Sequence, residues 1–384
     1  MPFGAAVTIA PGPQPWRHAM SLFSRVVVFG LAVVLAPRLL AQEVAWTDIR
    51  GLGVEGRGFE KTKSFFDRLP AASEKLVRPP VWSLSQDSAG MCVRFVTSAT
   101  TLHARWTLRR QRLALPHMPA TGVSGVDLYV RDEKRRWRWL ACGFPTKSPT
   151  NSVRLVGGIP RGRREYMLYL PLYNGVTSVE IGVPAGQSID KAPPRPASHS
   201  KSILFYGTSI TQGACASRPG MTHLAILGRR YERPVINLGF SGNGRMEIEL
   251  ADLLAELDPA VYVLDCLPNM NAQAVAARVE PFVRRLRKTR PTTPIVLVED
   301  RSYADSFLVT GKRKRNEGNW RALTIAYQKL KQDGVVGLHY LPGANLLGDD
   351  GEATVDSSHP NDLGFMRQAE ALSKVLGPLL KTAK

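Results

Sequence analysis

Five short apolar runs divide the second half of the chain, and they constrain its fold more than any other feature. Each run is almost entirely apolar, which is typical of parallel strands buried on both faces. Between them, apolar residues recur every three or four positions and so lie on one face of a helix. The pattern predicts a doubly wound, three-layer α/β/α domain with a parallel sheet of about five strands and ligands at the carboxyl ends of the strands. The runs are 203–207 (ILFYG), 235–239 (VINLG), 261–266 (VYVLDC), 295–299 (IVLVE) and 335–341 (VVGLHYL).

Between residues 42 and 183 the apolar residues follow a period of two instead. Leu102, Ala104, Trp106 and Leu108 alternate with polar residues, as in a half-buried strand. Similar short runs, separated by Gly, Pro and Asn, predict an all-β sandwich of jelly-roll-like form. Residues 184–200 are rich in Pro, Ala and Ser without periodicity, and we interpret them as a linker to the domain at 201–384. The further runs are 93–97, 126–132, 137–144, 166–173 and 176–183.

The first 41 residues have the layout of a secretory signal peptide. They contain three arginines, no acid, and an apolar run at 26–36 followed by the small residue Ala41. The run is too short to span a bilayer as a helix, and Pro37 ends it, which disfavours a buried core helix. With Met20 as an alternative start, the layout predicts a secreted or periplasmic protein whose mature chain has no transmembrane segment.

Lysine and arginine outnumber aspartate and glutamate by 51 to 32. Most of the excess lies in residues 42–199, which hold 24 basic and 13 acidic side chains, against 24 and 19 in residues 200–384. In an exported protein this charge favours acidic polysaccharide as a partner over nucleic acid, and the sequence has no nucleic-acid-binding motif. A solvated surface without a dedicated partner is the alternative.

The four cysteines, Cys92, Cys142, Cys215 and Cys266, form no CxxC pair and no Cys/His cluster at metal-ligand spacing. We therefore expect no structural metal. Export would permit disulfides, with Cys92–Cys142 and Cys215–Cys266 as pairs within each half. Four cysteines allow three connectivities, and the sequence leaves the choice open.

Ser209 follows the first apolar run, just after Gly207, and precedes a predicted helix. This position holds a serine at the edge of the sheet beside helical N–H groups, which suits a nucleophile; a helix N-cap is the common alternative. A nucleophilic serine needs a base, and the base needs an orienting carboxylate. His359 and Asp356, three residues apart after the last predicted strand, can supply both. The alternative is that Asp356 caps the final helix and His359 is simply exposed.

Acyl transfer also needs hydrogen-bond donors for the developing oxyanion. Gly239 ends the second predicted strand, where the absence of a side chain lets a backbone N–H approach closely, and Asn269 follows the third. Each loop alone is common. With Ser209 and His359, however, they place four candidate groups at four strand exits, which favours a catalytic site.

In their order along the chain, these four blocks resemble the SGNH (GDSL-type) hydrolase family. The resemblance covers residues 201 to about 380 and implies a flavodoxin-like hydrolase domain. Thr208 replaces the aspartate of the family's GDS, and CLPN replaces the commoner GxND. The blocks are Ser209 in GTSIT, Gly239 in NLGFSG, Asn269 in CLPNM and His359 in DSSHP.

The resemblance implies a role for each residue of the candidate site. Ser209 would be the nucleophile, His359 the general base and later acid, and Asp356 its orienter. The oxyanion hole would consist of the backbone N–H groups of Ser209 and Gly239 with the Asn269 side chain. No metal or organic cofactor would be required.

Residues 125–129, GVDLY, are similar to the signature of a β-domain that precedes some bacterial SGNH esterases. This similarity implies a carbohydrate ester as the substrate. From the residues alone, Asp127 is more simply a turn or strand-edge residue than a catalytic one, with Leu128 and Tyr129 on opposite faces of one strand.

Three further residues are candidates for substrate binding. Glu299 and Asp300 lie at the exit of the fourth predicted strand, where solvated acids are the alternative, and Arg218 follows the nucleophile segment. The basic run 312–315 is interpreted as a solvated loop, and His223 is expected to pack on a helix.

The sequence thus predicts a secreted serine esterase that removes a short acyl group, acetyl foremost, from a sugar or polysaccharide. A lipid or thioester hydrolase is the alternative within the same chemistry. A non-catalytic glycan-binding protein is the alternative from another class, and the presence of Ser209, Asp356 and His359 counts against it.

Overall fold

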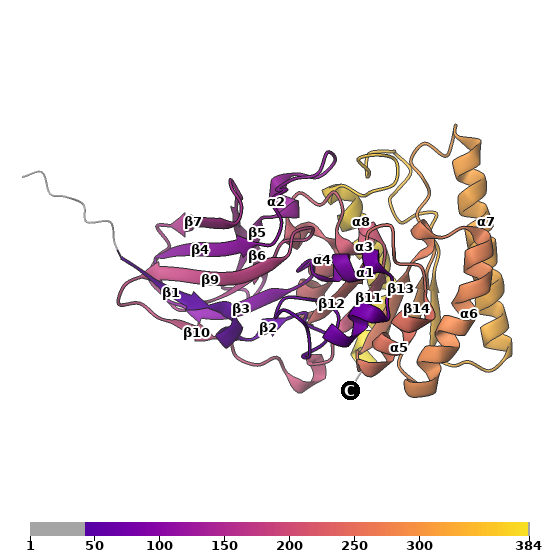
Figure 1. The fold of residues 1–384 in the computed structure, drawn as a ribbon, viewed down its shortest axis with the longest axis horizontal. Helices are drawn as coiled ribbons and strands as arrows, with labels where there is room; N and C mark the ends of the chain where they lie inside the picture. Colours follow the sequence, from indigo (N-terminus) through magenta and orange to yellow (C-terminus); the bar gives the residue numbers. More distant parts are fainter. Residues whose placement is uncertain (1–42, 383–384) are drawn as a thin grey trace, which may run out of the picture. The chain divides into compact units, whose positions relative to one another are not determined.

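The computed structural model describes residues 43–382. Two antiparallel sheets form the first half and one parallel sheet the second (Figure 1). The antiparallel strands are β1 (Val44–Asp48), β2 (Val54–Glu55), β3 (Cys92–Thr97), β4 (Thr101–Leu108), β5 (Val126–Arg131), β6 (Trp137–Gly143), β7 (Thr150–Gly157), β8 (Arg164–Tyr169), β9 (Val176–Pro184) and β10 (Ile189–Lys191). The parallel strands are β11 (Ile203–Gly207), β12 (Val235–Gly239), β13 (Val261–Asp265), β14 (Ile295–Val298) and β15 (Leu338–Leu341).

Most of the long helices follow the parallel strands. The α-helices are α1 (Pro79–Ser85), α2 (Ala120–Val123), α3 (Ser209–Gln212), α4 (His223–Tyr231), α5 (Ile248–Glu256), α6 (Ala272–Thr289), α7 (Thr310–Gln332) and α8 (Asp362–Thr382). The 3-10 helices are η1 (Ile49–Leu52), η2 (Ala71–Lys75), η3 (Ala197–His199), η4 (Pro219–Met221) and η5 (Leu267–Asn269).

The first half is a β-sandwich. One sheet has the order β1-β9-β4-β7, and the other has the order β10-β3-β8-β5-β6 with β2 beside β3. A single apolar cluster includes Trp106 of β4, Ile181 of β9 and Tyr166 of β8, so the two sheets pack face to face. Along β4, buried residues alternate with partly exposed ones, as the period of two predicts. The expectation of a preceding all-β domain is confirmed.

The second half has a five-stranded parallel sheet in the order β12-β11-β13-β14-β15. This is the 2-1-3-4-5 order of flavodoxin-like folds. Successive residues of β11 face opposite layers: Leu204 and Tyr206 belong to the apolar cluster of α5, α6 and α7, whereas Ile203 and Phe205 belong to that of α4 and α8. The predicted three-layer α/β/α domain is confirmed.

Three strands differ from the sequence-based predictions. β15 begins at Leu338 rather than at residue 335, because Gly337 has a φ of 66° and interrupts the extended chain. β7 was not predicted, since it is an edge strand with mostly polar or part-exposed positions. Within 184–200, the segment interpreted as a linker, β10 pairs antiparallel with β3 and extends the sandwich.

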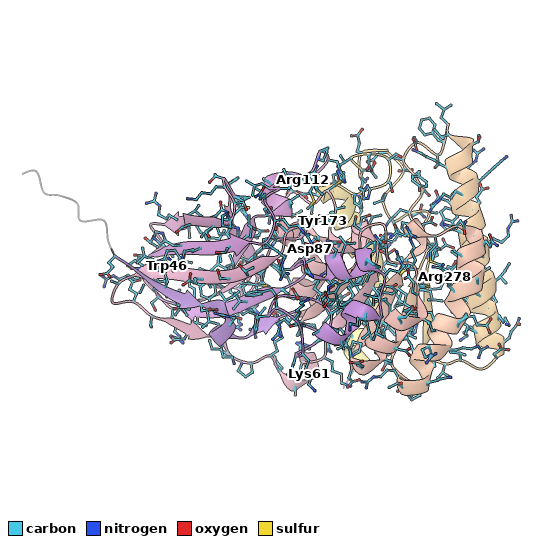
Figure 2. The ribbon with its side chains drawn as sticks, in the orientation of Figure 1. Trp46, Lys61, Asp87, Arg112, Tyr173 and Arg278 are labelled. Carbon is cyan, nitrogen blue, oxygen red and sulfur yellow. The ribbon has the colours of Figure 1, made fainter. Side chains whose placement is uncertain are left out.

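Buried contacts join the two halves. Trp82 of α1 and Phe59 belong to the same apolar cluster as α5 and α6, although both residues precede the sandwich's main strands. β3 is buried on both faces, because the outer face of its sheet packs against Ala225 of α4. In Figure 2 the labelled side chains of Asp87 and Tyr173 lie at this junction.

Two expectations about export can be compared with the structure. The four cysteines are free thiols, so neither pairing within a half is formed. Among residues 43–382, no helix is long and apolar enough to cross a membrane. The signal peptide expected at 1–41 lies outside the described residues.

Candidate active site

Ser209 lies at the carboxyl edge of the parallel sheet, on the sharp turn from β11 into α3. Thr208 caps α3: its Oγ1 accepts a hydrogen bond of 3.2 Å from the Ile210 N–H. The threonine that replaces the family's aspartate is therefore the N-cap, which leaves the Ser209 hydroxyl free for another partner. As the first residue of α3, Ser209 also has a backbone N–H without a carbonyl partner inside the helix.

The loop that precedes α8 brings His359 to this serine. The Ser209 Oγ lies 2.8 Å from His359 Nε2, and His359 Nδ1 lies 2.7 Å from Asp356 Oδ2. Asp356 Oδ1 accepts the backbone N–H groups of Ser358 at 3.1 Å and His359 at 2.7 Å, so the carboxylate also shapes the turn. Burial raises the pKa of Asp356, but the hydrogen bonds from His359 outweigh it and hold this pKa below its ordinary value. The structure thus brings together the three residues that sequence reasoning selected.

Gly239, in contrast, does not present a free donor. Its N–H donates to Asn237 Oδ1 at 2.9 Å. A Cβ on Gly239 would lie only 2.1 Å from the Gln212 backbone nitrogen, so the glycine is required for close packing of β12 against α3. The expected oxyanion role of Gly239 is therefore corrected: the residue is needed there for its size.

The loop after Gly239 offers a different N–H. Ser241 N–H donates to Gln212 Oε1, Asn243 N–H and Gly244 N–H donate to the Phe240 carbonyl, and Phe240 N–H donates to the carbonyl of Gly207. Among the described residues, Gly242 is the member of this loop whose N–H has no hydrogen-bond partner. It is exposed and has a φ of 69°, a conformation that glycine adopts without strain.

Asn269 lies against the same loop. With its amide oriented so that Oδ1 faces the backbone, the oxygen accepts from Asn243 N–H at 3.0 Å and Gly244 N–H at 3.2 Å. The opposite orientation would set Nδ2 against two N–H donors, which is unfavourable. The preferred orientation leaves Nδ2 to donate elsewhere.

Comparisons with known proteins show to which family this chain belongs. The model of the GDSL-like lipase/acylhydrolase family matches residues 200–377, and that of the N-terminus of SGNH-hydrolase-type esterases, GxDLY, matches residues 44–189. A protein of Bacteroides ovatus described as a GDSL-like lipase is 32% identical, with a TM-score of 0.83 over 88% of this chain and 98% of its own. The chain belongs to the GDSL-like lipase/acylhydrolase family. It is therefore a carboxylic-ester hydrolase.

More distant solved structures share the fold of this GDSL-like hydrolase. The salicylyl-acyltransferase SsfX3 from a tetracycline biosynthetic pathway is 19% identical, with a TM-score of 0.70 over 88% of this chain and 97% of its own. A family two carbohydrate esterase from Cellvibrio japonicus is 14% identical, with a TM-score of 0.57 over 88% and 98%. A comparison with curated proteins gives no match.

The GxDLY signature of this hydrolase anchors a loop next to the site. Asp127 is fully buried; its Oδ2 accepts from Arg218 Nη1 at 2.7 Å and from Gly220 N–H at 2.8 Å, and its Oδ1 accepts from Trp139 Nε1 at 2.9 Å. Arg218 also donates to the Tyr129 hydroxyl. Arg218 therefore binds the β-sandwich, and its expected substrate-binding role is not supported.

Glu299 and Asp300 also have partners inside the protein. Glu299 is 7% exposed and accepts from Gly343 N–H and the Tyr340 hydroxyl. Asp300 is 2% exposed and accepts from Arg315 and Asn319 of α7. Both acids are buried rather than solvated or open to a ligand, so neither the substrate role nor its alternative holds.

The Asp300 cluster supports the turn that carries Asn269. Arg315 Nη2 donates to the carbonyl oxygens of Pro268 at 2.9 Å and Met270 at 2.8 Å, and Asn319 Nδ2 donates to Met270 at 3.1 Å. Asp300 Oδ2 accepts from both side chains. Arg315 belongs to the run that we interpreted as a solvated loop, but the run lies in α7 and this residue points inward.

A buried ion pair contacts α3 from the end of β13. Arg301 donates to both oxygens of Asp265 at 2.7 and 2.5 Å, and both side chains are 2% exposed. Asp265 Oδ2 also accepts from Thr211 of α3 at 3.3 Å. His223, expected on a helix, is fully buried in α4, where it stacks on Phe365.

Sequence reasoning missed the residues that the first half brings to the site. The Tyr173 hydroxyl donates to the Ser209 carbonyl at 3.0 Å, and the His117 ring lies 5.5 Å from that of His359. Both residues lie in loops of the β-sandwich domain, far from Ser209 in the sequence. No local pattern marks either of them, because their roles arise only when the two halves pack together.

Proposed function

We propose that this GDSL-like hydrolase is a secreted serine esterase that removes short acyl groups, acetyl foremost, from a carbohydrate. The observation that carries the mechanism is the continuous chain of hydrogen bonds from Ser209 Oγ through His359 to Asp356, at 2.8 and 2.7 Å. Such a chain is the arrangement that activates a serine for acyl transfer.

His359 acts first as a base and then as an acid. Its Nε2 takes the proton from Ser209 Oγ as that oxygen attacks the ester carbonyl, and Asp356 stabilises the resulting imidazolium at Nδ1. The proton then passes from Nε2 to the leaving alcohol, which gives an acyl-serine. Water, deprotonated by the same nitrogen, attacks this acyl group and releases the acid and free Ser209.

We assign the oxyanion hole to the N–H groups of Ser209 and Gly242 and to Asn269 Nδ2. The support is that, among the described residues, the N–H groups of Ser209 and Gly242 have no hydrogen-bond partner, whereas Gly239 N–H is bound to Asn237. Asn269 Nδ2 has one long hydrogen bond, of 3.5 Å to the Phe240 carbonyl, and the preferred amide orientation removes it. Donors held in place before the reaction need no reorganisation when the negative charge develops. The Arg315 and Asn319 contacts position Asn269 through its own backbone turn.

Serine rather than cysteine is the nucleophile in this proposal. Cys215 also lies close to His359, but it is 5% exposed, and burial together with Asp356 raises its pKa to about 12. A thiol with that pKa carries almost no thiolate at neutral pH. Ser209, in contrast, is hydrogen-bonded directly to the base.

The substrate class rests on the fold and on charge. The family two carbohydrate esterase from Cellvibrio japonicus shares both the sandwich and the hydrolase fold. The first half of the chain carries most of the excess of basic residues, which favours an acidic polysaccharide as the acylated partner. The signal-like layout of residues 1–41 supports secretion.

A lipid or thioester substrate is the second candidate, and one observation favours it. Phe307, Leu308 and Val309 are 80%, 74% and 40% exposed. Phe307 lines a cavity of about 260 Å³, together with Tyr303, Leu347 and Thr354 among others. An apolar rim beside the loop that carries His359 could accept a longer acyl chain.

Hydrolysis of p-nitrophenyl esters from acetate to dodecanoate tests both candidates, with Ser209→Ala as the matched variant. We expect the highest rate with acetate and none above background for Ser209→Ala. A maximum at the long chains would favour the lipid candidate. Equal inactivity of both proteins with these esters and with acetylated glycans would contradict the esterase mechanism and favour glycan binding without catalysis.

A further inference from the structure

Three side chains that can bind a metal converge beside Ser209. His117 comes from the loop between β4 and α2, Cys215 from the segment after α3, and His359 from the loop before α8. One ring nitrogen of each histidine and the Cys215 Sγ all lie within 4.8 Å of one another. These residues are far apart in the sequence, so no spacing motif could reveal the cluster.

The chemistry and dimensions of this His-Cys-His cluster suit Zn²⁺. Imidazole nitrogen and thiolate sulfur are its preferred ligands, and three protein ligands with an open fourth position make an accessible zinc site. Tetrahedral zinc with bonds of about 2.0–2.3 Å places its ligand atoms about 3.3–3.6 Å apart. The ligand atoms need to approach by no more than about 1.5 Å. His117 is exposed and can rotate to close that distance.

Cys215 is held where the two imidazoles can reach it. Its φ is 70°, in the left-handed region that residues with a side chain seldom occupy. Strained conformations of this kind persist only where the surroundings fix them, and they cluster at functional sites. Two residues further on, Ser217 is fixed by hydrogen bonds from its N–H and Oγ to Asp362 of α8.

We propose that the His-Cys-His cluster is an inhibitory zinc site, at which bound Zn²⁺ switches off the esterase. The loss of activity rests on the proposed function, whereas the binding itself does not. His359 Nε2 is bonded to Ser209 and Nδ1 to Asp356. A metal on either nitrogen breaks one of the two hydrogen bonds that activate the serine. Cys215 binds as the thiolate and releases its proton to solvent as the Zn–S bond forms.

Equilibrium dialysis with ⁶⁵Zn²⁺ tests the site without any assay of activity. We expect one tightly bound Zn²⁺ per chain and a large loss of affinity in His117→Ala and in Cys215→Ser. Loss of an outer-shell partner already weakens metal sites about 10–100-fold, so loss of a ligand should cost at least about tenfold. His199→Ala and Cys142→Ser remove the same side-chain types outside the cluster and should bind as the wild type does.

Cobalt provides a spectroscopic check of the sulfur ligand. Co²⁺ in place of Zn²⁺ should give the charge-transfer absorption of a thiolate–cobalt bond, and Cys215→Ser should abolish it while Cys142→Ser retains it. Absence of the band in wild type, or its persistence in Cys215→Ser, would contradict the assigned ligand set.

The functional consequence is tested with the ester on which the protein is active. We expect Zn²⁺ to inhibit the wild type and a chelator to restore activity. With each protein measured against its own metal-free rate, His117→Ala should raise the half-inhibiting concentration at least about tenfold. Equal inhibition of wild type and His117→Ala would overturn the proposal. If the metal-free protein has no esterase activity, the proposed function fails, and dialysis still decides whether the site binds zinc.

Discussion

At the scale of single residues, Asp356 has two roles in the proposed triad. Asp356 orients the His359 ring through Oδ2 and shapes the catalytic turn through Oδ1. Since the carboxylate side chain is 41% exposed, its removal should affect catalysis much more than folding. An asparagine at this position has nearly the same shape as the aspartate, but it carries no negative charge to stabilise the positive imidazolium of His359.

We therefore expect Asp356→Asn to lower kcat by about 10³–10⁴-fold, with a melting temperature close to that of the wild type. Steady-state kinetics and thermal unfolding on the same preparation measure both. A decrease of less than tenfold would show that His359 does not depend on this carboxylate.

Asp300 shows a residue-scale effect of burial on stability. Burial, which outweighs Asn319 and Arg315, raises the pKa of Asp300 from 3.8 to about 6. Between these two values the folded protein keeps a proton that the unfolded chain has released. The free energy of unfolding therefore falls as the pH rises through this window, by about 3 kcal/mol in total.

The side chain of the Asp300→Asn variant does not titrate, so the variant's free energy of unfolding should not show this decrease with rising pH. Urea unfolding at pH 4 and pH 7 should show the stability of the variant rising relative to wild type by about 2 kcal/mol. Asp252→Asn, at an exposed acid of α5, controls for the removal of one charge. A difference between wild type and Asp300→Asn that stays constant with pH would contradict the assignment.

The sequence selected Ser209, His359 and Asp356 as a group, and the structure places their side chains in hydrogen-bond contact. The selection was possible because each residue stands at a strand exit or before a helix, and a serine, a histidine and an aspartate in that arrangement have few other uses. It selected Gly239 for its place in a motif, but the sequence does not show which N–H in a turn is already bonded. The Asn237 side chain accepts a hydrogen bond from the Gly239 N–H. The Gly242 N–H, in contrast, has no hydrogen-bond partner among the described residues.

At the scale of elements, the parallel sheet was predictable and the sandwich edges were not. Runs such as ILFYG are buried on both faces, so their composition alone identifies β11 and β12. β10 has three residues at a sheet edge, and a pattern that short resembles a linker. Whether these residues form a strand depends on their pairing with β3, and the composition of the segment does not encode that pairing.

The loop of residues 213–222 is the element that the GxDLY signature controls. Asp127 is the buried acceptor for Arg218 and for the Gly220 backbone, and burial raises its pKa even with that arginine beside it. Asp127→Asn keeps the volume but leaves the Arg218 charge without a carboxylate.

We expect Asp127→Asn to lower stability by about 3–5 kcal/mol and to increase hydrogen exchange across 213–222. Urea unfolding and exchange measured by mass spectrometry test these effects. Glu133→Gln, at an exposed acid two residues after the same strand, should change neither. Unchanged exchange in Asp127→Asn would show that the loop does not depend on this anchor.

At the scale of the whole molecule, the two halves depend on each other. Arg68 is 2% exposed, and its Nη1 donates to the carbonyl oxygens of Asn237 at 3.0 Å and Gly239 at 2.7 Å, at the end of β12. Tyr173 likewise bonds the Ser209 carbonyl. Local sequence patterns separated the halves because they carry no information on such distant contacts.

We therefore propose that residues 200–384 do not fold and work alone. Removal of the first half would expose the apolar residues that Trp82 and Phe59 cover and would leave the end of β12 without Arg68. Expressed alone, this segment should show no cooperative thermal unfolding and no esterase activity. Cooperative unfolding with full activity would show that the sandwich serves only as an appended domain.

Whole-molecule mass spectrometry after rapid mixing with p-nitrophenyl acetate tests the central claim most directly. The account predicts that the protein gains the mass of one acetyl group, that peptide mapping places it on Ser209, and that Ser209→Ala gains nothing. An acetyl group on Cys215 or elsewhere, with turnover intact in Ser209→Ala, would contradict it.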